Sequence, residues 1–139
     1  MRRQIQLSSQ LHNGVLSPQD REMAILRIAW LCQAPYEWGE HVAIGKRVAG
    51  LSTEDIERIT KGSSAAGWTA HESAVLSAVE ELYETATISE ETWAELQRTL
   101  NNQQLYELPV VVGTYQTFAY MHKSIQFRLN EGNTGLNMR

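Results

Sequence analysis

The chain has 139 residues, of which 42% are apolar and 20% charged, and its formal net charge is -4. This composition predicts one soluble globular domain, and the acidic balance, without a Lys/Arg cluster, speaks against a nucleic-acid partner. No apolar run approaches the roughly 20 residues of a membrane span, and the N-terminus lacks the apolar stretch of a signal peptide. The single cysteine, Cys32, excludes an intrachain disulfide and fits a reducing cytosol, so we expect a cytoplasmic protein.

Capping residues, glycines and prolines divide the chain into six to seven predicted helices and no sheet. The helices are expected at residues 3–12, 18–33, 35–49, 53–61, 70–85, 90–100 and 102–127. Pro109 and Gly113 are expected to bend the last of them. The polar tail, residues 128–139, is expected to be flexible or to serve in assembly. The sequence therefore predicts an all-α fold, with residues 1–139 forming a single domain whose core covers about residues 16–127.

The second and third predicted helices form a hairpin around which the other helices are expected to pack. Between Met23 and Leu31 only Arg27 is polar. A helix that is apolar on most of its circumference is buried in a bundle. Pro35 cannot donate a backbone hydrogen bond and clashes with the preceding turn, so it separates the two helices.

Glu37 and His41 stand four residues apart at the start of the third predicted helix, and therefore on one helix face. A carboxylate beside an imidazole is a plausible proton relay, because histidine titrates near neutral pH. The alternative is a surface pair worth about 0.2–0.5 kcal/mol, and the spacing alone favours this alternative. The other histidines share no ligand spacing with His41, so no metal site is expected.

Glu22 is a second candidate, because it shares a helix stripe with the apolar residues of the hairpin's first helix. A carboxyl group that faces an apolar core can act as an acid or a base. The alternative is a first-turn glutamate that the helix dipole favours. A strictly antiparallel hairpin would leave Glu22 and His41 roughly 9 Å apart along the helix axis, a gap that oblique crossing or long side chains could close.

Four further side chains could contribute to a pocket or a core. Trp38, Trp68 and Tyr115 are candidate substrate-binding walls, with core packing as the alternative reading. Cys32 has no neighbouring cysteine or base in the sequence, so structural packing is the favoured interpretation of its thiol.

The segment from Asp20 to Gly62, DREMAILRIAWLCQAPYEWGEHVAIGKRVAGLSTEDIERITKG, resembles the carboxymuconolactone decarboxylase family of the alkyl hydroperoxidase D-like superfamily. The similarity continues through GWTAHESAVLSAVEELYETATISEETWAEL and LPVVVGTYQTFAYMHKSI and covers about residues 16–127. The resemblance implies an all-α fold and a homo-oligomer, either a trimer or a hexamer.

The resemblance also implies a thiol-free site. In the peroxidase branch of the superfamily, a glutamate, a C-x-x-C pair and a histidine form the active site. The relay glutamate corresponds to Glu22 and the histidine to His41, but Ala34 and Glu37 stand at the two thiol positions. Cys32 is out of register by two residues. This departure argues against a dithiol peroxidase.

The decarboxylase branch carries a glutamate and a histidine in the arrangement of Glu37 and His41, and its members act in aromatic catabolism without a cofactor. The resemblance implies a cofactor-independent lyase that acts on a small carboxylated lactone or related ring acid. His41 would be the general acid/base, Glu37 would orient it or share its proton, and Glu22 would be a buried relay. The alternatives are a thiol peroxidase that uses Cys32 alone and a non-catalytic oligomeric binding protein on the same fold.

Overall fold

The computed structural model describes residues 14–139, so the helix predicted at residues 3–12 lies outside the described part. The described chain forms six α-helices, one short 3-10 helix and no strand. They are α2 (Pro18–Leu31), α3 (Pro35–Ala49), α4 (Thr53–Lys61), α5 (Ala70–Thr85), α6 (Glu90–Leu96), α7 (Asn102–Ser124) and η1 (Gly135–Asn137). The all-α prediction is confirmed.

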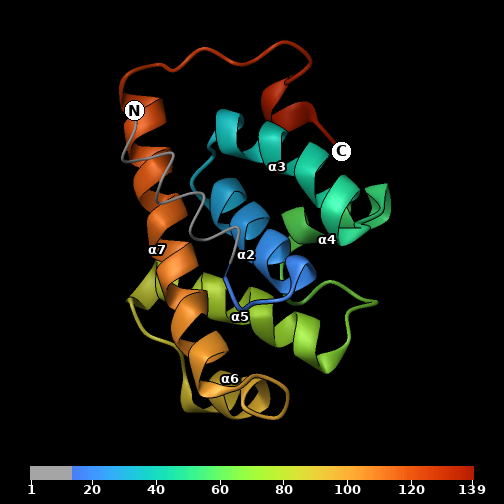
Figure 1. Cartoon of the computed structure of the whole chain (residues 1–139), viewed down its shortest axis with the longest axis vertical. Helices are drawn as coiled ribbons and strands as arrows, with labels where there is room; N and C mark the ends of the chain where they lie inside the picture. The colour runs from blue at the N-terminus through green and yellow to red at the C-terminus, as the bar shows by residue number, and fades with distance from the viewer. Residues whose placement is uncertain (1–13) are drawn as a thin grey trace.

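Helix α2 lies at the centre of the bundle, as Figure 1 shows, and packs against α3, α5, α7 and α4. Every residue from Asp20 to Ala29 is buried. The one polar side chain of its apolar segment, Arg27, is hydrogen-bonded to two neighbouring helices. Its Nε donates to Glu80 and its Nη1 donates to the carbonyls of Ile59 and Thr60. A buried guanidinium therefore ties α2 to α4 and α5.

The capping residues explain where the helices begin and end. The hydroxyl of Ser17 accepts from the backbone of Asp20, and Pro18 occupies the first turn of α2. Capping boxes start α4 at Ser52 and α5 at Thr69. Gly50 ends α3 with φ of 67°, a left-handed conformation that suits glycine.

Three predicted helices end earlier in the structure, and the first of them, α2, stops at Leu31 rather than at residue 33. Helix α6 stops at Leu96 rather than at residue 100, because residues 97–100 form turns before Asn101 caps α7. Helix α7 continues through Pro109 and ends at Ser124 rather than at residue 127. Gln126 has φ of 51°, which is incompatible with another α-helical turn.

The C-terminal segment, residues 128–139, differs from the flexible tail that its polarity predicts. It crosses from the end of α7 to the outer side of α3 (Figure 1). The indole of Trp38 donates to the carbonyl of Met138, and Asn133 bonds to the carbonyl of Tyr36 and to Glu40. These contacts with α3 hold the segment against the bundle.

None of the helices between residues 14 and 139 is long and apolar enough to cross a membrane.

Candidate functional site

The α2–α3 hairpin brings Glu22 and His41 into direct contact. Oε2 of Glu22 lies 2.6 Å from Nδ1 of His41, and both side chains are buried, that of Glu22 completely. The two helices touch close to this pair, since a Cβ added at Gly45 would lie 3.7 Å from Cβ of Glu22. Gly45 and His41 are one helical turn apart on α3. The side chain of Glu22, which starts beside Gly45, therefore reaches His41 by extending along this single turn. The axial gap expected from the sequence is closed in this way.

The surroundings of the pair are apolar on one side and charged on the other. The ring edge of Tyr115, from α7, faces the imidazole of His41, with centroids 5.0 Å apart and planes at 89°. The second oxygen of Glu22, Oε1, lies 3.6 Å from Nε of Arg21. No hydrogen bond to a described residue reaches this oxygen. A hydrogen bond between a carboxylate and an imidazole in such a dry setting is stronger than one in water.

Glu37 does not pair with His41. Its Oε1 is hydrogen-bonded to Nδ1 of His122, 85 positions away in α7. Both residues are buried. The interpretation of Glu37 as the residue that orients His41 is thus not supported by the geometry, in which Glu22 contacts His41.

His122 is the residue that sequence reasoning missed. Tyr36, Phe127 and Phe118 surround its ring at centroid distances of 4.9, 4.7 and 6.3 Å. Its neighbours in the sequence, Met121 and Lys123, gave no sign of a carboxylate partner. Only the packing of α7 against α3 brings it to Glu37.

The predicted tryptophan walls lie in different parts of the molecule. Trp38 is completely buried, contacts Trp30 and bonds to the C-terminal segment. Trp68 donates to the carbonyl of Gly62, and the guanidinium of Arg58 lies over its ring. These contacts of Trp68 belong to the connection between α4 and α5. Tyr115 is the predicted wall residue that contacts the Glu22–His41 pair.

Cys32 lies at the C-terminal end of α2 and is half-buried. Burial raises the pKa of its thiol, and the nearby carboxylate of Glu37 adds to this effect, while Lys123 opposes it. A raised pKa leaves little of the thiolate that a peroxidase needs.

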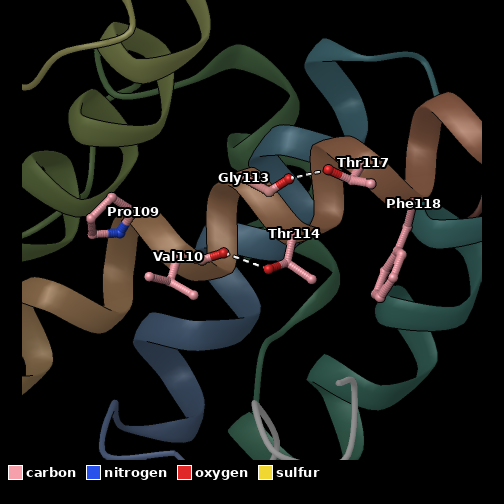
Figure 2. Close-up of a pocket in the computed structure, with 6 residues that line it drawn as sticks. All are labelled: Pro109, Val110, Gly113, Thr114, Thr117 and Phe118. Atoms are coloured by element: carbon pink, nitrogen blue, oxygen red, sulfur yellow. Dashed lines mark hydrogen bonds between the residues drawn. The ribbon is translucent and has the colours of Figure 1, made fainter. Parts of the chain in front are cut away.

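A shallow groove of about 280 Å³ runs along α7. Figure 2 shows the six residues that line it, which are Pro109, Val110, Gly113, Thr114, Thr117 and Phe118. The hydroxyls of Thr114 and Thr117 donate to backbone carbonyls one turn earlier. Phe118 also contacts the ring of Tyr115, at a centroid distance of 5.3 Å, so the groove adjoins the aromatic side of the site.

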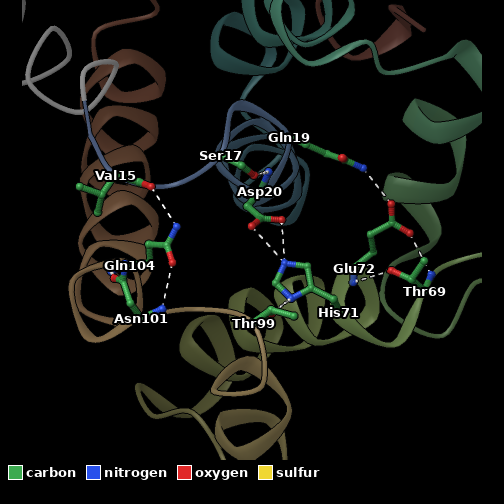
Figure 3. Close-up of polar contacts among 10 residues, drawn as sticks. All are labelled: Val15, Ser17, Gln19, Asp20, Thr69, His71, Glu72, Thr99, Asn101 and Gln104. Atoms are coloured by element: carbon green, nitrogen blue, oxygen red, sulfur yellow. Dashed lines mark hydrogen bonds and ion pairs between the residues drawn. The ribbon is translucent and has the colours of Figure 1, made fainter.

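A third histidine–carboxylate pair involves the first turn of α2, two residues before Glu22. Figure 3 shows His71 between Asp20 and Thr99, with its Nε2 3.0 Å from both oxygens of Asp20 and its Nδ1 2.7 Å from the hydroxyl of Thr99. The hydrogen bond to Asp20 raises the pKa of His71. This pair connects α2, α5 and the turn before α7.

Within residues 14–139, no group of three or more His, Cys, Asp and Glu side chains is arranged to hold a metal ion.

A family model for the carboxymuconolactone decarboxylase family matches residues 2–81, more than half of the chain. The chain belongs to the carboxymuconolactone decarboxylase family. The match includes Glu22, Glu37 and His41, whereas Tyr115 and His122 lie beyond it. In this member of the carboxymuconolactone decarboxylase family, the Glu22–His41 pair therefore lies within the matched region, whereas the Glu37–His122 pair joins a residue inside it to one outside it.

The fold of this carboxymuconolactone decarboxylase family member is also found among solved structures. A protein of unknown function from Agrobacterium tumefaciens, with a suggested role as the antioxidant defence protein AhpD, superposes with a TM-score of 0.81. The sequences are 17% identical, and the alignment covers 93% of this chain and 89% of the other. At this identity the likeness concerns the fold alone. A comparison with curated proteins found no match.

Proposed function

We propose that this chain is a cofactor-independent lyase that removes carbon dioxide from a small carboxylated lactone or related ring acid. His41 is its general acid/base, and Glu22 is the buried carboxylate that orients the imidazole of His41. The observation that carries the proposal is the 2.6 Å contact between Glu22 and His41 in a buried position. Family membership supports the same reaction class.

The proposed reaction needs a proton donor and no electron carrier. The bond between the ring carbon and the carboxylate breaks, its electron pair moves into the unsaturated ring as an enolate, and carbon dioxide leaves. The imidazolium of His41 then gives its proton to the ring carbon, and water restores that proton. One proton is consumed for each carbon dioxide released. Glu22 holds the imidazole of His41 in position for this transfer, because its Oε2 bonds to Nδ1.

Apolar contacts support the placement of the ring acid next to this pair. Tyr115 faces His41 edge-on and offers an aromatic surface. A dry aromatic wall favours decarboxylation, since a carboxylate that loses its hydration moves more readily toward neutral carbon dioxide. We assign Tyr115 to the substrate wall, whereas Trp38 packs on Trp30 and belongs to the core.

The direct test measures carbon dioxide release from carboxymuconolactone, the compound for which the family is named. The wild-type protein is expected to release carbon dioxide without added metal or cofactor. His41→Gln is expected to lower kcat by about 10²–10⁴-fold, the usual contribution of a general acid/base. Unchanged turnover in His41→Gln, with an unchanged circular dichroism spectrum, would refute the assignment of His41.

We further propose that the protein works as a trimer or hexamer. The resemblance to the family implies this assembly, and the outer face of α7 supports it. Several large apolar side chains are exposed on and just after this helix, namely Tyr106, Val110, Tyr120, Met121 and Ile125. Exposed apolar side chains of this size often mark an interface between proteins. Light scattering should give three or six times the 15.7 kDa chain mass.

A further inference from the structure

The Glu37–His122 pair has no part in the reaction described above, yet it repeats the arrangement of Glu22 and His41. In both pairs a glutamate oxygen bonds to Nδ1 of a histidine. In both pairs the two side chains are at least nine-tenths buried. Burying a carboxylate in a protein interior is costly, so a second buried pair needs a structural or a chemical reason.

The second oxygen of Glu37 indicates a chemical reason. Oε2 of Glu37 is buried and has no hydrogen-bond partner among the described residues. Leaving a buried acceptor unsatisfied costs about 1–3 kcal/mol, more when the group is charged. A carboxylate that served only to join α3 to α7 would be expected to use both oxygens. An unsatisfied, buried carboxylate oxygen is instead typical of a group that meets a ligand, a water molecule or a proton during function.

The two pairs belong to one region of the molecule. Glu37 and His41 are four residues apart on α3, which places them one turn, roughly 6 Å, from each other along the helix. On α7, Tyr115 contacts His41 and Phe118 contacts His122, and these two aromatic rings also contact each other. The two imidazoles therefore border the two ends of one aromatic surface between α3 and α7.

We propose that Glu37–His122 is a second acid/base pair that acts on the same substrate molecule as His41. This inference rests on the proposed decarboxylation and assigns to His122 the lactone carbonyl oxygen. As the bond to the carboxylate breaks, His122 gives a proton to this oxygen, and the ring becomes a neutral enol. His41 then protonates the ring carbon while the enol oxygen returns its proton to His122. The sum is unchanged, with one proton consumed for each carbon dioxide released.

The presence of two imidazoles suits the assignment of one to the carbonyl oxygen and the other to the ring carbon. In an unsaturated five-membered lactone, the carbonyl oxygen and the carbon that bore the carboxylate lie on different sides of the ring. A single imidazole cannot serve both atoms at once. Two imidazoles at the two ends of a shared aromatic surface can do so. The proposal therefore restricts the substrate class to ring acids in which the electron pair of the breaking bond can be delocalised onto a carbonyl oxygen.

The test separates this chemical role from a structural one by means of His122→Asn. The amide nitrogen of asparagine lies close to the position of Nδ1, so it can keep the hydrogen bond to Glu37, but it cannot carry a proton back and forth. We expect His122→Asn to fold with a near-wild-type thermal midpoint and to lose about 10²-fold or more in kcat on carboxymuconolactone. The dependence of its kcat on pH should differ from that of the wild type. Glu37→Gln, which keeps the side-chain shape, should show the same losses and serves if the first variant does not fold.

His71→Asn is the matched control, because it alters a histidine–carboxylate pair away from this aromatic surface, and it should retain wild-type kcat. Wild-type kcat and an unchanged pH profile in folded His122→Asn or Glu37→Gln would overturn the second pair while leaving the role of His41 intact. A wild-type protein that releases no carbon dioxide would overturn the proposed function, and the second pair with it.

Discussion

Glu22 and His41 are 19 positions apart, and the hairpin brings Oε2 of the first within 2.6 Å of Nδ1 of the second. The glutamate is completely buried in the centre of the bundle. A charge in this position is tolerated because its partner is fixed on the adjacent helix. The proposed acid/base pair is therefore also a point on which the stability of the fold depends.

Replacing Glu22 should therefore affect stability as well as activity. Glu22→Ala removes one partner of a buried pair and leaves a cavity, so we expect a loss of about 3 kcal/mol or more in the free energy of unfolding. Glu22→Gln keeps the side-chain volume and should cost less, about 1–3 kcal/mol. Urea denaturation at pH 7 measures both values. Equal stabilities of the alanine, glutamine and wild-type proteins would show that the pair is not formed in solution.

Gly113 and Gly45 both lie in helices, and replacing them by alanine is predicted to have opposite effects on stability. A Cβ at Gly113, on the exposed side of α7, would meet no atom within 4 Å. Gly113→Ala should therefore stabilise the protein by about 0.5–1 kcal/mol, because alanine is the better helix former. A Cβ at Gly45 would lie only 3.0 Å from Cδ1 of Leu51, next to Glu22. Gly45→Ala should destabilise the protein by pressing against the side chain of Leu51, and thermal unfolding of both variants checks the contrast.

The helices could be predicted from local signals, whereas the second pair could not. Ser17, Ser52 and Thr69 cap helices where the sequence indicates, because capping depends on residues three positions away. The contact between Glu37 and His122 joins residues 85 positions apart. No local pattern encodes such a distance. The i, i+4 spacing of Glu37 and His41 suggested a pair, but tertiary packing gave each residue a different partner.

The C-terminal segment shows the same limit of local reasoning. Its polar residues predict a flexible tail when they are considered alone. In the structure, Asn133 satisfies a backbone carbonyl of α3, and Arg139 reaches Glu57 of α4. The indole nitrogen of Trp38 finds its acceptor at Met138. The segment is ordered because it supplies partners that buried polar groups of α3 require.

Cys32 should be dispensable for any activity of the protein. Burial raises the pKa of its thiol above the ordinary value of 9.0, so little thiolate is present at neutral pH. We expect labelling by a disulfide reagent to be slow at pH 7 and to accelerate as the pH rises above 9. Cys32→Ser should retain carbon dioxide release within about twofold. Peroxide consumption that disappears in Cys32→Ser would favour the thiol peroxidase instead.

His71 should make the stability of the fold depend on pH. Its hydrogen bond to Asp20 raises its pKa above the ordinary value of 6.5, and the charges of Asp20, Glu72 and Glu95 act in the same direction against partial burial. When the pKa of a histidine is higher in the folded state than in the unfolded state, its protonation stabilises the folded state. This stabilisation is complete at a pH below the unfolded-state pKa, and it is lost as the pH rises through the folded-state pKa. The thermal midpoint should therefore fall between about pH 6.5 and the higher folded pKa. His71→Asn should remove this fall in the thermal midpoint while leaving the hydroxyl of Thr99 and the start of α7 in place. If the thermal midpoint of His71→Asn still falls with pH as steeply as that of the wild type, another group is responsible for the fall.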